Sequence, residues 1–99
     1  MLTGYDHEPF EVDILASDVE WGGSFYVHQV EDDRIDGLNN TYMIEIQPSG
    51  YEFWVDLDSY EVPGGPQVYY VGIYGNVLQF FCDEDLSGGT LRFTPIPWS

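Results

Sequence analysis

Carboxylates are the residues with which this sequence could do chemistry. It contains eighteen Asp and Glu, two Arg, two His and no Lys. Paired carboxylates act as acid and base in glycosidases, and clustered ones bind calcium. The sequence leaves a glycosidase-like pair open, because it offers many pairs and no spacing that selects one. Asp56, Asp58 and Glu61 could contribute to a calcium site, but they lack the spacing of a twelve-residue calcium loop.

The remaining chemistry-bearing residues form no recognisable motif. His7, His28 and Cys82 lie far apart in the sequence and do not have the spacing of a zinc site. No nucleophile motif, phosphate-binding glycine loop or dinucleotide fingerprint is present, and the paired glycines are typical of turns. We therefore expect no enzyme activity, no cofactor and no functional metal site.

Most of the carboxylates fall into four groups along the chain. Each group taken alone is typical of a solvated loop or sheet face. Taken together without any Lys between them they favour a function, because ordinary solvated faces mix both signs. The groups are Asp6, Glu8, Glu11 and Asp13; Glu31, Asp32, Asp33 and Asp36; Glu52, Asp56, Asp58 and Glu61; and Asp83, Glu84 and Asp85.

The formal net charge of −16 needs a reason, because repulsion among so many carboxylates destabilises a folded domain. Three explanations are compatible with it: a basic partner, a bound cation or a high-salt environment. Nucleic acid and phospholipid headgroups would repel an anionic surface, so we expect neither as a direct partner.

The sequence also bears on location. The residues that follow Met1 include neither the basic region nor the apolar run of a signal peptide, and no stretch approaches the roughly 18 apolar residues of a membrane span. The one cysteine cannot form an internal disulfide, so the fold needs no oxidising compartment. We therefore expect a cytoplasmic protein.

The elements that position the carboxylates are predicted to be strands. With 99 residues, 43% hydrophobic and 17% aromatic, residues 1–99 can form a single domain with a real core. Short alternating runs are separated by turn residues, and no helical period extends over ten residues. The fold class predicted is all-β, or β-rich α+β: a small antiparallel sandwich or barrel of about seven strands with acidic loops.

Residues 41–57 carry the clearest β pattern. Apolar and polar residues alternate at 41–47 and again at 51–58, and Pro48-Ser49-Gly50 between them is typical of a turn. The hairpin's apolar face is predicted to hold Tyr42, Ile44, Ile46, Tyr51, Phe53, Val55 and Leu57. Its acidic face is predicted to hold Glu45, Glu52, Trp54, Asp56 and Asp58.

Other strands are predicted at 10–16, 24–30, 68–74, 77–82 and 90–94, with loops at 31–40, 58–66 and 83–89. Gly75-Asn76 predicts a tight hairpin between two of these strands. Both of its strands are apolar nearly throughout, so we expect this hairpin to be covered on both faces. Pro95 and Pro97 predict that the last strand lies at a sheet edge.

An acidic sheet face flanked by acidic loops can present charge as a nucleic-acid backbone does. Duplex DNA carries one charge per roughly 1.7 Å, which a single strand of carboxylates roughly 6.8 Å apart cannot match but several strands could approach. A β-rich, lysine-free, intensely acidic chain of about this length without a catalytic motif is similar to virus-encoded nucleic-acid mimics that block host defence nucleases. Anti-CRISPR and anti-restriction proteins are examples. The resemblance is one of composition and implies no residue roles.

The leading hypothesis is an inhibitor that blocks the DNA- or RNA-binding groove of a basic protein, acting in the host cytoplasm if the protein is viral. The partner would be a CRISPR effector, a restriction enzyme or another nuclease. Trp54 is the candidate anchor, although it could instead cover a second layer of the fold. The predicted partner-binding residues are Glu45, Glu52, Trp54, Asp56, Asp58, Glu61, Glu31, Asp32, Asp33, Asp36, Asp83, Glu84 and Asp85.

Three alternatives stay open. An immunity protein that neutralises a nuclease toxin would use the same electrostatics. A sugar-binding or virion structural β-module would need exposed aromatic residues in a plane and would not need the charge. Adaptation to high salt could explain the acidity without a partner, but it does not call for 17% aromatic residues.

Overall fold

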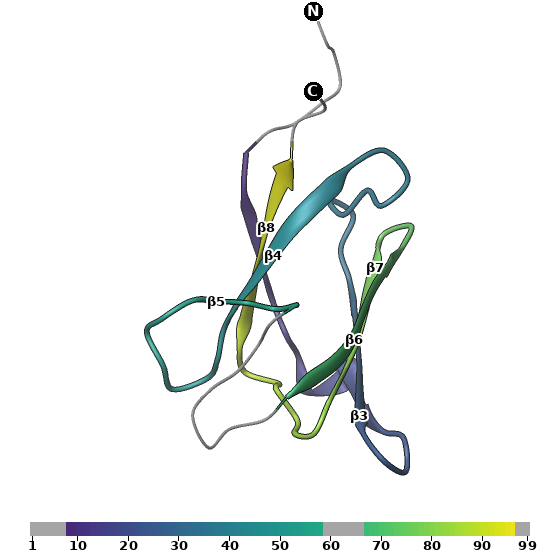
Figure 1. Ribbon diagram of the computed structural model, residues 1–99, viewed down its shortest axis with the longest axis vertical. Helices are drawn as coiled ribbons and strands as arrows, with labels where there is room; N and C mark the ends of the chain where they lie inside the picture. The colour runs from purple at the N-terminus through teal and green to yellow at the C-terminus, as the bar shows by residue number, and fades with distance from the viewer. Residues whose placement is uncertain (1–7, 59–66, 97–99) are drawn as a thin grey trace, which may run out of the picture.

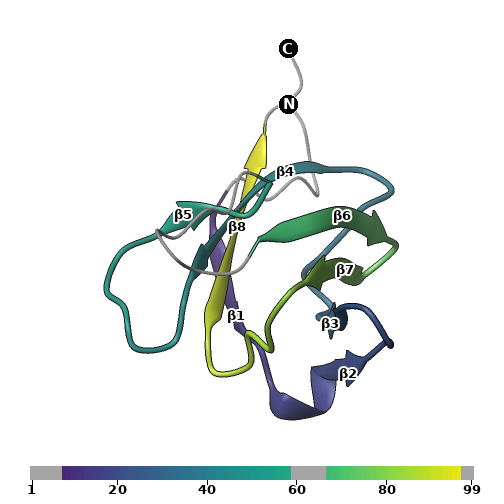
Figure 2. The same ribbon diagram turned by 60° about the horizontal axis from the view of Figure 1, so that its bottom comes forward.

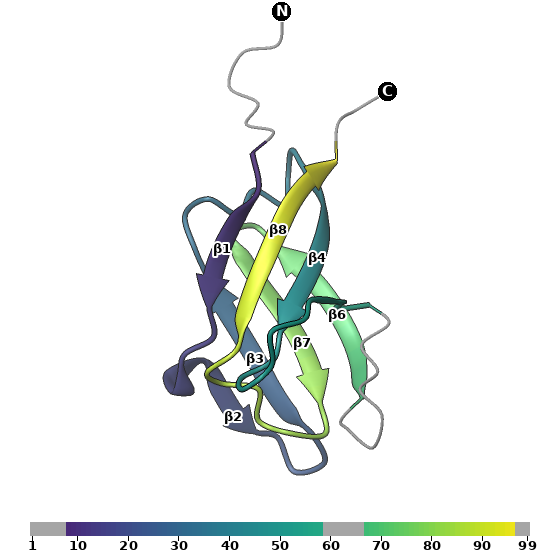
Figure 3. The same cartoon turned by 90° about the vertical axis from the view of Figure 1, so that its left-hand side faces the viewer.

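The computed structural model describes residues 8–58 and 67–96, which form a sandwich of two four-stranded antiparallel sheets (Figures 1 and 3). The first sheet has the order β1-β8-β4-β5 and the second the order β2-β3-β7-β6. The strands are β1 (Phe10–Asp13), β2 (Val19–Trp21), β3 (Tyr26–Glu31), β4 (Thr41–Gln47), β5 (Val55–Asp56), β6 (Val68–Tyr74), β7 (Val77–Cys82) and β8 (Thr90–Ile96). The predicted all-β antiparallel sandwich is confirmed.

Helical structure in the described residues is limited to one 3₁₀ turn, Ala16–Asp18. This turn ends the first predicted strand early, so β1 stops at Asp13 and Ala16 is exposed. The short strand β2 that follows was not predicted. None of the described helical residues forms a helix long and apolar enough to cross a membrane.

The core lies between the sheets and is built from one face of each strand. The alternation is clearest in β7 and β8, where every second residue is buried. Phe93 of β8 stacks on Phe10 of β1 with ring centroids 5.1 Å apart. The buried apolar residues are Ile14, Val30, Ile35, Ile44, Ile46, Leu57, Val68, Leu78, Phe80, Cys82, Leu86, Leu91 and Phe93.

The β6–β7 hairpin forms around Gly75-Asn76 as predicted, with Gly75 at φ 64°. Its expected burial on both faces is wrong. β6 is an edge strand, and Tyr69, Tyr70 and Tyr74 on it are exposed. The run looks apolar in the sequence because tyrosines occupy its outward positions, where a ring can cover the sheet while its hydroxyl meets solvent.

β8 lies between β1 and β4, so its predicted position at a sheet edge is wrong. The backbone N–H of Leu57 bonds to Ile44, which directs alternate backbone groups of β4 toward β5 and the intervening ones toward β8. This alternation turns the ring nitrogen of Pro95 toward the β1 side. β1 begins only at Phe10, opposite Phe93, so Pro95 lies past the β1 ladder and no donor is missing there.

The predicted hairpin at 41–57 is confirmed only in part. β4 forms as expected, but β5 is two residues long, and Ile46 pairs with Val55. Pro48 is buried and has no N–H, so the ladder cannot continue through it. Residues 48–54 form a loop instead, in which Tyr51 and Phe53 are 50% and 43% exposed rather than buried.

Several predicted features lie outside the described residues. They are Asp6, His7, Glu61, Pro97 and all but the first residue of the predicted 58–66 loop.

Candidate functional site

A row of charged side chains crosses the outer face of the first sheet. Strand register places Glu11 opposite Arg92, Arg92 opposite Glu45, and Glu45 opposite Asp56. Residues that lie directly opposite each other on neighbouring strands project from the same side of the sheet. Each of the four neighbouring strands therefore contributes one side chain to the row. The row contains three carboxylates and one guanidinium, and it spans about 14 Å over three strand spacings.

Arg92 is held within this row by a carboxylate and an aromatic ring. Its Nε donates to Glu45 Oε1 at 3.0 Å, and its Nη2 lies 3.0 Å from the same oxygen. The guanidinium carbon lies 4.1 Å from the centre of the Trp54 ring. Glu45 and Trp54, both predicted to bind a partner, therefore already bind a cation of their own chain.

Arg34 is held in the same way at the β1 end of this sheet. Its Nε and Nη2 donate to the two carboxylate oxygens of Asp32 at 2.9 and 3.0 Å. Its guanidinium lies over the Phe10 ring, 4.9 Å from the ring centre. These hydrogen bonds from Arg34 lower the pKa of Asp32. Because the sequence has no Lys, the two pairs account for every Lys and Arg in the chain.

The acidic loop after β3 is fixed against the β6–β7 turn. The Asp32 N–H bonds to Asn76, and the Gly37 N–H bonds to Gly75 at 2.8 Å. Asp36 accepts hydrogen bonds from the backbone and side chain of Asn39. Glu31 and Asp33 are exposed beside it. A shallow pocket of about 250 Å³ opens here, lined by Glu8, Phe10, Asp33, Arg34, Asp36, Asn40 and Tyr42.

The second acidic loop lies at the other end of β7. Asp83 accepts a hydrogen bond from the Tyr69 hydroxyl at 3.1 Å, and Asp85 accepts one from the Ser87 backbone at 2.8 Å. The Ser87 bond lowers the pKa of Asp85. The six residues of β7 separate the two acidic loops by about 20 Å. The predicted site residues therefore lie on one sheet face and at two ends of the sandwich, not in one place.

Glu52 and Asp58 are both exposed near the first sheet, Glu52 in the 48–54 loop and Asp58 directly after β5. The N–H of Asp58 bonds to the side chain of Asp56. Partner binding by any of these residues stays a prediction.

His28 supports the second acidic loop from beneath. Its Nε2 accepts the Leu86 N–H at 3.0 Å, and its ring stacks on Phe80 with centroids 4.4 Å apart. Burial lowers the pKa of His28, although the charges of Asp85 and Asp18 act in the opposite direction. His28 is therefore a neutral structural acceptor at neutral pH.

The second sheet contains β2, β3, β7 and β6 in succession (Figure 2). Its outer face is aromatic. The Phe25 ring lies 4.7 Å from Tyr69 and 6.3 Å from Phe81, and Tyr70 lies 5.2 Å from Phe81. We call Phe25, Tyr69, Tyr70, Tyr74 and Phe81 the aromatic face. Sequence reasoning missed it, although the register fixed by the Gly75-Asn76 turn could have placed Tyr70 beside Phe81.

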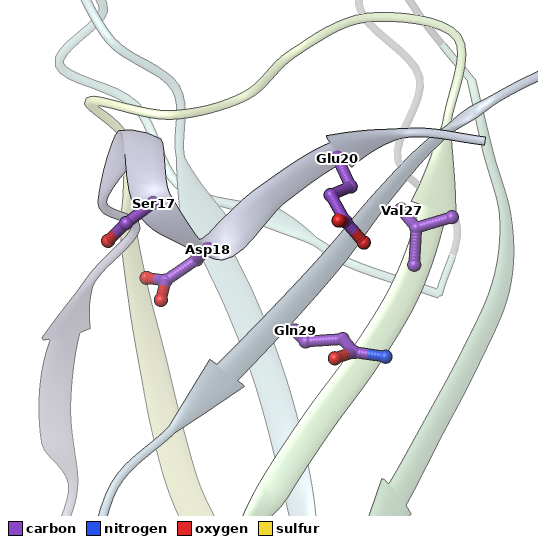
Figure 4. Close-up of a pocket in the computed structure, with 5 residues that line it drawn as sticks. All are labelled: Ser17, Asp18, Glu20, Val27 and Gln29. Atoms are coloured by element: carbon purple, nitrogen blue, oxygen red, sulfur yellow. The ribbon is translucent and has the colours of Figure 1, made fainter.

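Carboxylates border the aromatic face. Register places Glu20 opposite Val27 and Val27 opposite Phe81, so Glu20 lies at one end of the aromatic row. Figure 4 shows Glu20 and Asp18 beside Val27 and Gln29 in a shallow pocket of about 140 Å³, which Ser17 also lines. Asp83 lies at another border, bonded to Tyr69.

Potential metal ligands and the one thiol are the remaining groups that bear on chemistry other than binding. Within residues 8–58 and 67–96, no group of three or more His, Cys, Asp or Glu could hold a metal ion. Cys82 is buried, and burial raises the pKa of its thiol, which makes it a poor nucleophile.

No protein-family model matches the chain, and no curated protein or solved structure is significantly similar to it. The functional argument therefore depends on the charges and contacts of the chain itself.

Proposed function

We propose that this protein is a stoichiometric inhibitor that occupies the nucleic-acid-binding groove of a basic protein. The partner we favour is a defence nuclease, a CRISPR effector or a restriction enzyme. One observation carries the proposal. The sequence has eighteen carboxylates and only two arginines, and each arginine is already paired with a carboxylate of the same chain. The protein thus has no Lys or Arg side chain left to offset its charge toward a partner.

The physical basis is competition for the same cationic side chains. Grooves that bind nucleic acid present Lys and Arg to phosphates, and carboxylates can pair with these groups, bidentately with Arg. A net charge of −16 also steers a basic protein toward the surface and raises the association rate.

The arrangement of charge supports partial mimicry by several surfaces acting together. A duplex carries about eight charges over the roughly 14 Å that the row on the first sheet spans, whereas this row contains three carboxylates. The acidic loops at the two ends of β7 add charge along a further axis of about 20 Å. We expect affinity to come from these surfaces jointly rather than from the row alone.

The test is an equilibrium competition on an isolated partner. The full chain captures basic proteins from a host lysate, and each purified partner is loaded with a fluorescent duplex of DNA or RNA. Titrated protein should displace the duplex, and the concentration needed should rise in proportion to the duplex present. Displacement should weaken as salt rises, because both ligands use the same Lys and Arg.

A charge-reversed variant locates the interface. Asp56→Lys/Asp58→Lys should lower the association rate on the order of tenfold, because two exposed carboxylates become repulsive. The matched control, Asp56→Asn/Asp58→Asn, keeps an acceptor for the Asp58 N–H and should give a smaller loss. An unchanged rate in the charge-reversed variant would place the interface on the loops at 31–36 and 83–85.

A further inference from the structure

Both arginines of this protein are bound by the same combination of groups. Arg92 lies between the Trp54 ring and the Glu45 carboxylate, and Arg34 lies between the Phe10 ring and the Asp32 carboxylate. A guanidinium suits such a site because its flat face stacks on a ring while its edge donates to a carboxylate. The chain itself therefore shows how its surface binds arginine.

The aromatic face of the second sheet offers the same combination without an arginine. Tyr69 is 50% exposed, contacts the Phe25 ring and donates to the Asp83 carboxylate. The row through Phe81 ends at Glu20, whose carboxylate lies in the pocket shown in Figure 4. Rings thus lie between carboxylates on two borders, and both arginines of the chain are bound elsewhere.

Charge complementarity selects the occupant of this face. A second copy of the chain would bring another −16 of charge, which opposes self-association through the aromatic face. A neutral sugar could stack on the rings and donate hydroxyl hydrogen bonds to the carboxylates that border them, but it carries no positive charge to offset theirs. An arginine side chain uses both the rings and the carboxylates.

We infer that the aromatic face is an arginine-binding surface, at which arginines of a basic protein partner stack on Tyr69, Tyr70 and Phe81 and pair with Glu20 and Asp83. This rests on the proposed function, for which it names the side chain that the partner supplies. The acidic first sheet attracts Lys and Arg alike, whereas the aromatic face distinguishes Arg from Lys, whose compact ammonium stacks less well.

The experiment compares octa-arginine with octa-lysine binding to the full chain by calorimetry at physiological ionic strength. Octa-arginine should bind about tenfold more tightly. Tyr69→Leu/Tyr70→Leu should reduce this ratio to near one, whereas Tyr69→Phe/Tyr70→Phe, which keeps both rings, should preserve most of it. Tyr51→Leu is the matched control, because Tyr51 is also 50% exposed but lies on the 48–54 loop. It should leave the ratio unchanged.

Aromatic proton resonances provide a readout that does not depend on stability. Octa-arginine should shift the signals of Phe25, Tyr69 and Phe81 more than those of Tyr51 and Phe53. An unchanged ratio in the Tyr69→Leu/Tyr70→Leu variant, or shifts confined to Tyr51 and Phe53, would overturn the inference. Shifts of the aromatic face caused by cellohexaose and not by octa-arginine would replace it with a sugar-binding surface.

Failure of this inference and failure of the proposed function give different results. Displacement of nucleic acid from a target without any arginine preference would retain the mimic and reject the arginine-binding surface. Arginine preference on the aromatic face without displacement would do the reverse.

Discussion

The two outer faces of the sandwich use the same kinds of residue in different proportions. On the first sheet, Arg92 lies between Glu11 and Glu45 and covers Trp54, so the face neutralises part of its own charge. On the second sheet, Phe81 and its neighbouring rings form the centre, and no arginine lies among them. One face is acidic with its cation built in, and the other is aromatic with its carboxylates at the border.

Excess charge and exposed aromatic surface therefore lie on different faces of this fold. The first sheet tolerates neighbouring carboxylates because Arg92 lies between two of them. On the second sheet the carboxylates lie at the borders, and the rings of Tyr69, Tyr70 and Tyr74 are exposed. Under the proposed function, charge on the first sheet would govern attraction of the partner over distance, and exposed rings on the second sheet would govern contact with it.

Removing Arg92 should produce the largest effect on stability. Arg92→Gln leaves Glu11, Glu45 and Asp56 on one sheet face with no cation among them and uncovers Trp54, so we expect a loss of about 2–4 kcal/mol in the free energy of unfolding. Urea denaturation measures it. Arg34→Gln, which removes a more exposed arginine of the same design, should cost clearly less. Equal losses would show that the neighbouring carboxylates of the row do not increase the contribution of Arg92 to stability.

Acid should act on the second sheet through His28. Its pKa is lowered from 6.5 by burial, so below that pH the unfolded chain binds a proton that the native state resists. Stability is therefore full above about pH 6.5 and falls as the pH drops toward the lowered native pKa. Protonated Nε2 could no longer accept the Leu86 N–H, a loss of about 1–3 kcal/mol.

The matched variant for His28 is His28→Gln, whose side-chain oxygen can accept the Leu86 N–H without titrating. Melting temperatures between pH 7 and pH 5 should fall in the wild type and stay level in the variant, because the Gln side chain does not bind a proton in this range. Parallel curves would assign the acid sensitivity to other groups.

Salt should change the melting temperature differently in variants of the two faces, and this effect should be smaller than that of acid. Screening relieves repulsion between carboxylates, so the melting temperature should rise from low to moderate salt. The rise should be steeper in Arg92→Gln, where the row has lost its cation, and unchanged in Tyr74→Leu on the second sheet. A melting temperature that falls steadily with salt would contradict uncompensated repulsion.

The smallest effect concerns the edge of the aromatic face. The hydroxyls of Tyr70 and Tyr74 contact each other over Gly72, where an added Cβ would lie 2.6 Å from the Tyr70 oxygen. Tyr74→Phe should cost about 0.5 kcal/mol or less, because both rings are exposed and stay in place.

Gly72→Ala should displace Tyr70 and reduce the preference for octa-arginine without unfolding the chain. An unaltered preference would exclude Tyr70 from the arginine-binding surface.

The sequence was informative where a local pattern of residues sets the geometry. Gly75-Asn76 fixed the β6–β7 hairpin, and alternation identified the buried face of β4. Prediction failed where the position of a neighbouring strand determines whether a segment pairs. Pro95 lies in a central strand because β1 begins past it, and the 48–54 loop replaces a strand because Pro48 ends the ladder. Neither fact is visible without the neighbouring strand.

The candidate site was predictable in kind and not in arrangement. The excess of carboxylates is plain from composition, and the alternation along the hairpin places Glu45 and Asp56 on one face. The stacking of Arg92 on Trp54 depends on β8 lying beside β4, a non-local pairing that no local pattern encodes. The aromatic face was missed because outward tyrosines resemble core residues in a sequence.

Nucleic-acid mimicry is tested directly by sedimentation velocity on a mixture of the isolated target, a labelled duplex and this protein, each at saturating concentration. If the protein occupies the cationic groove that binds the duplex, as we propose, the mixture should contain two binary complexes and no species with all three components. A ternary complex would contradict nucleic-acid mimicry, since the protein and the duplex would then occupy different sites on the target.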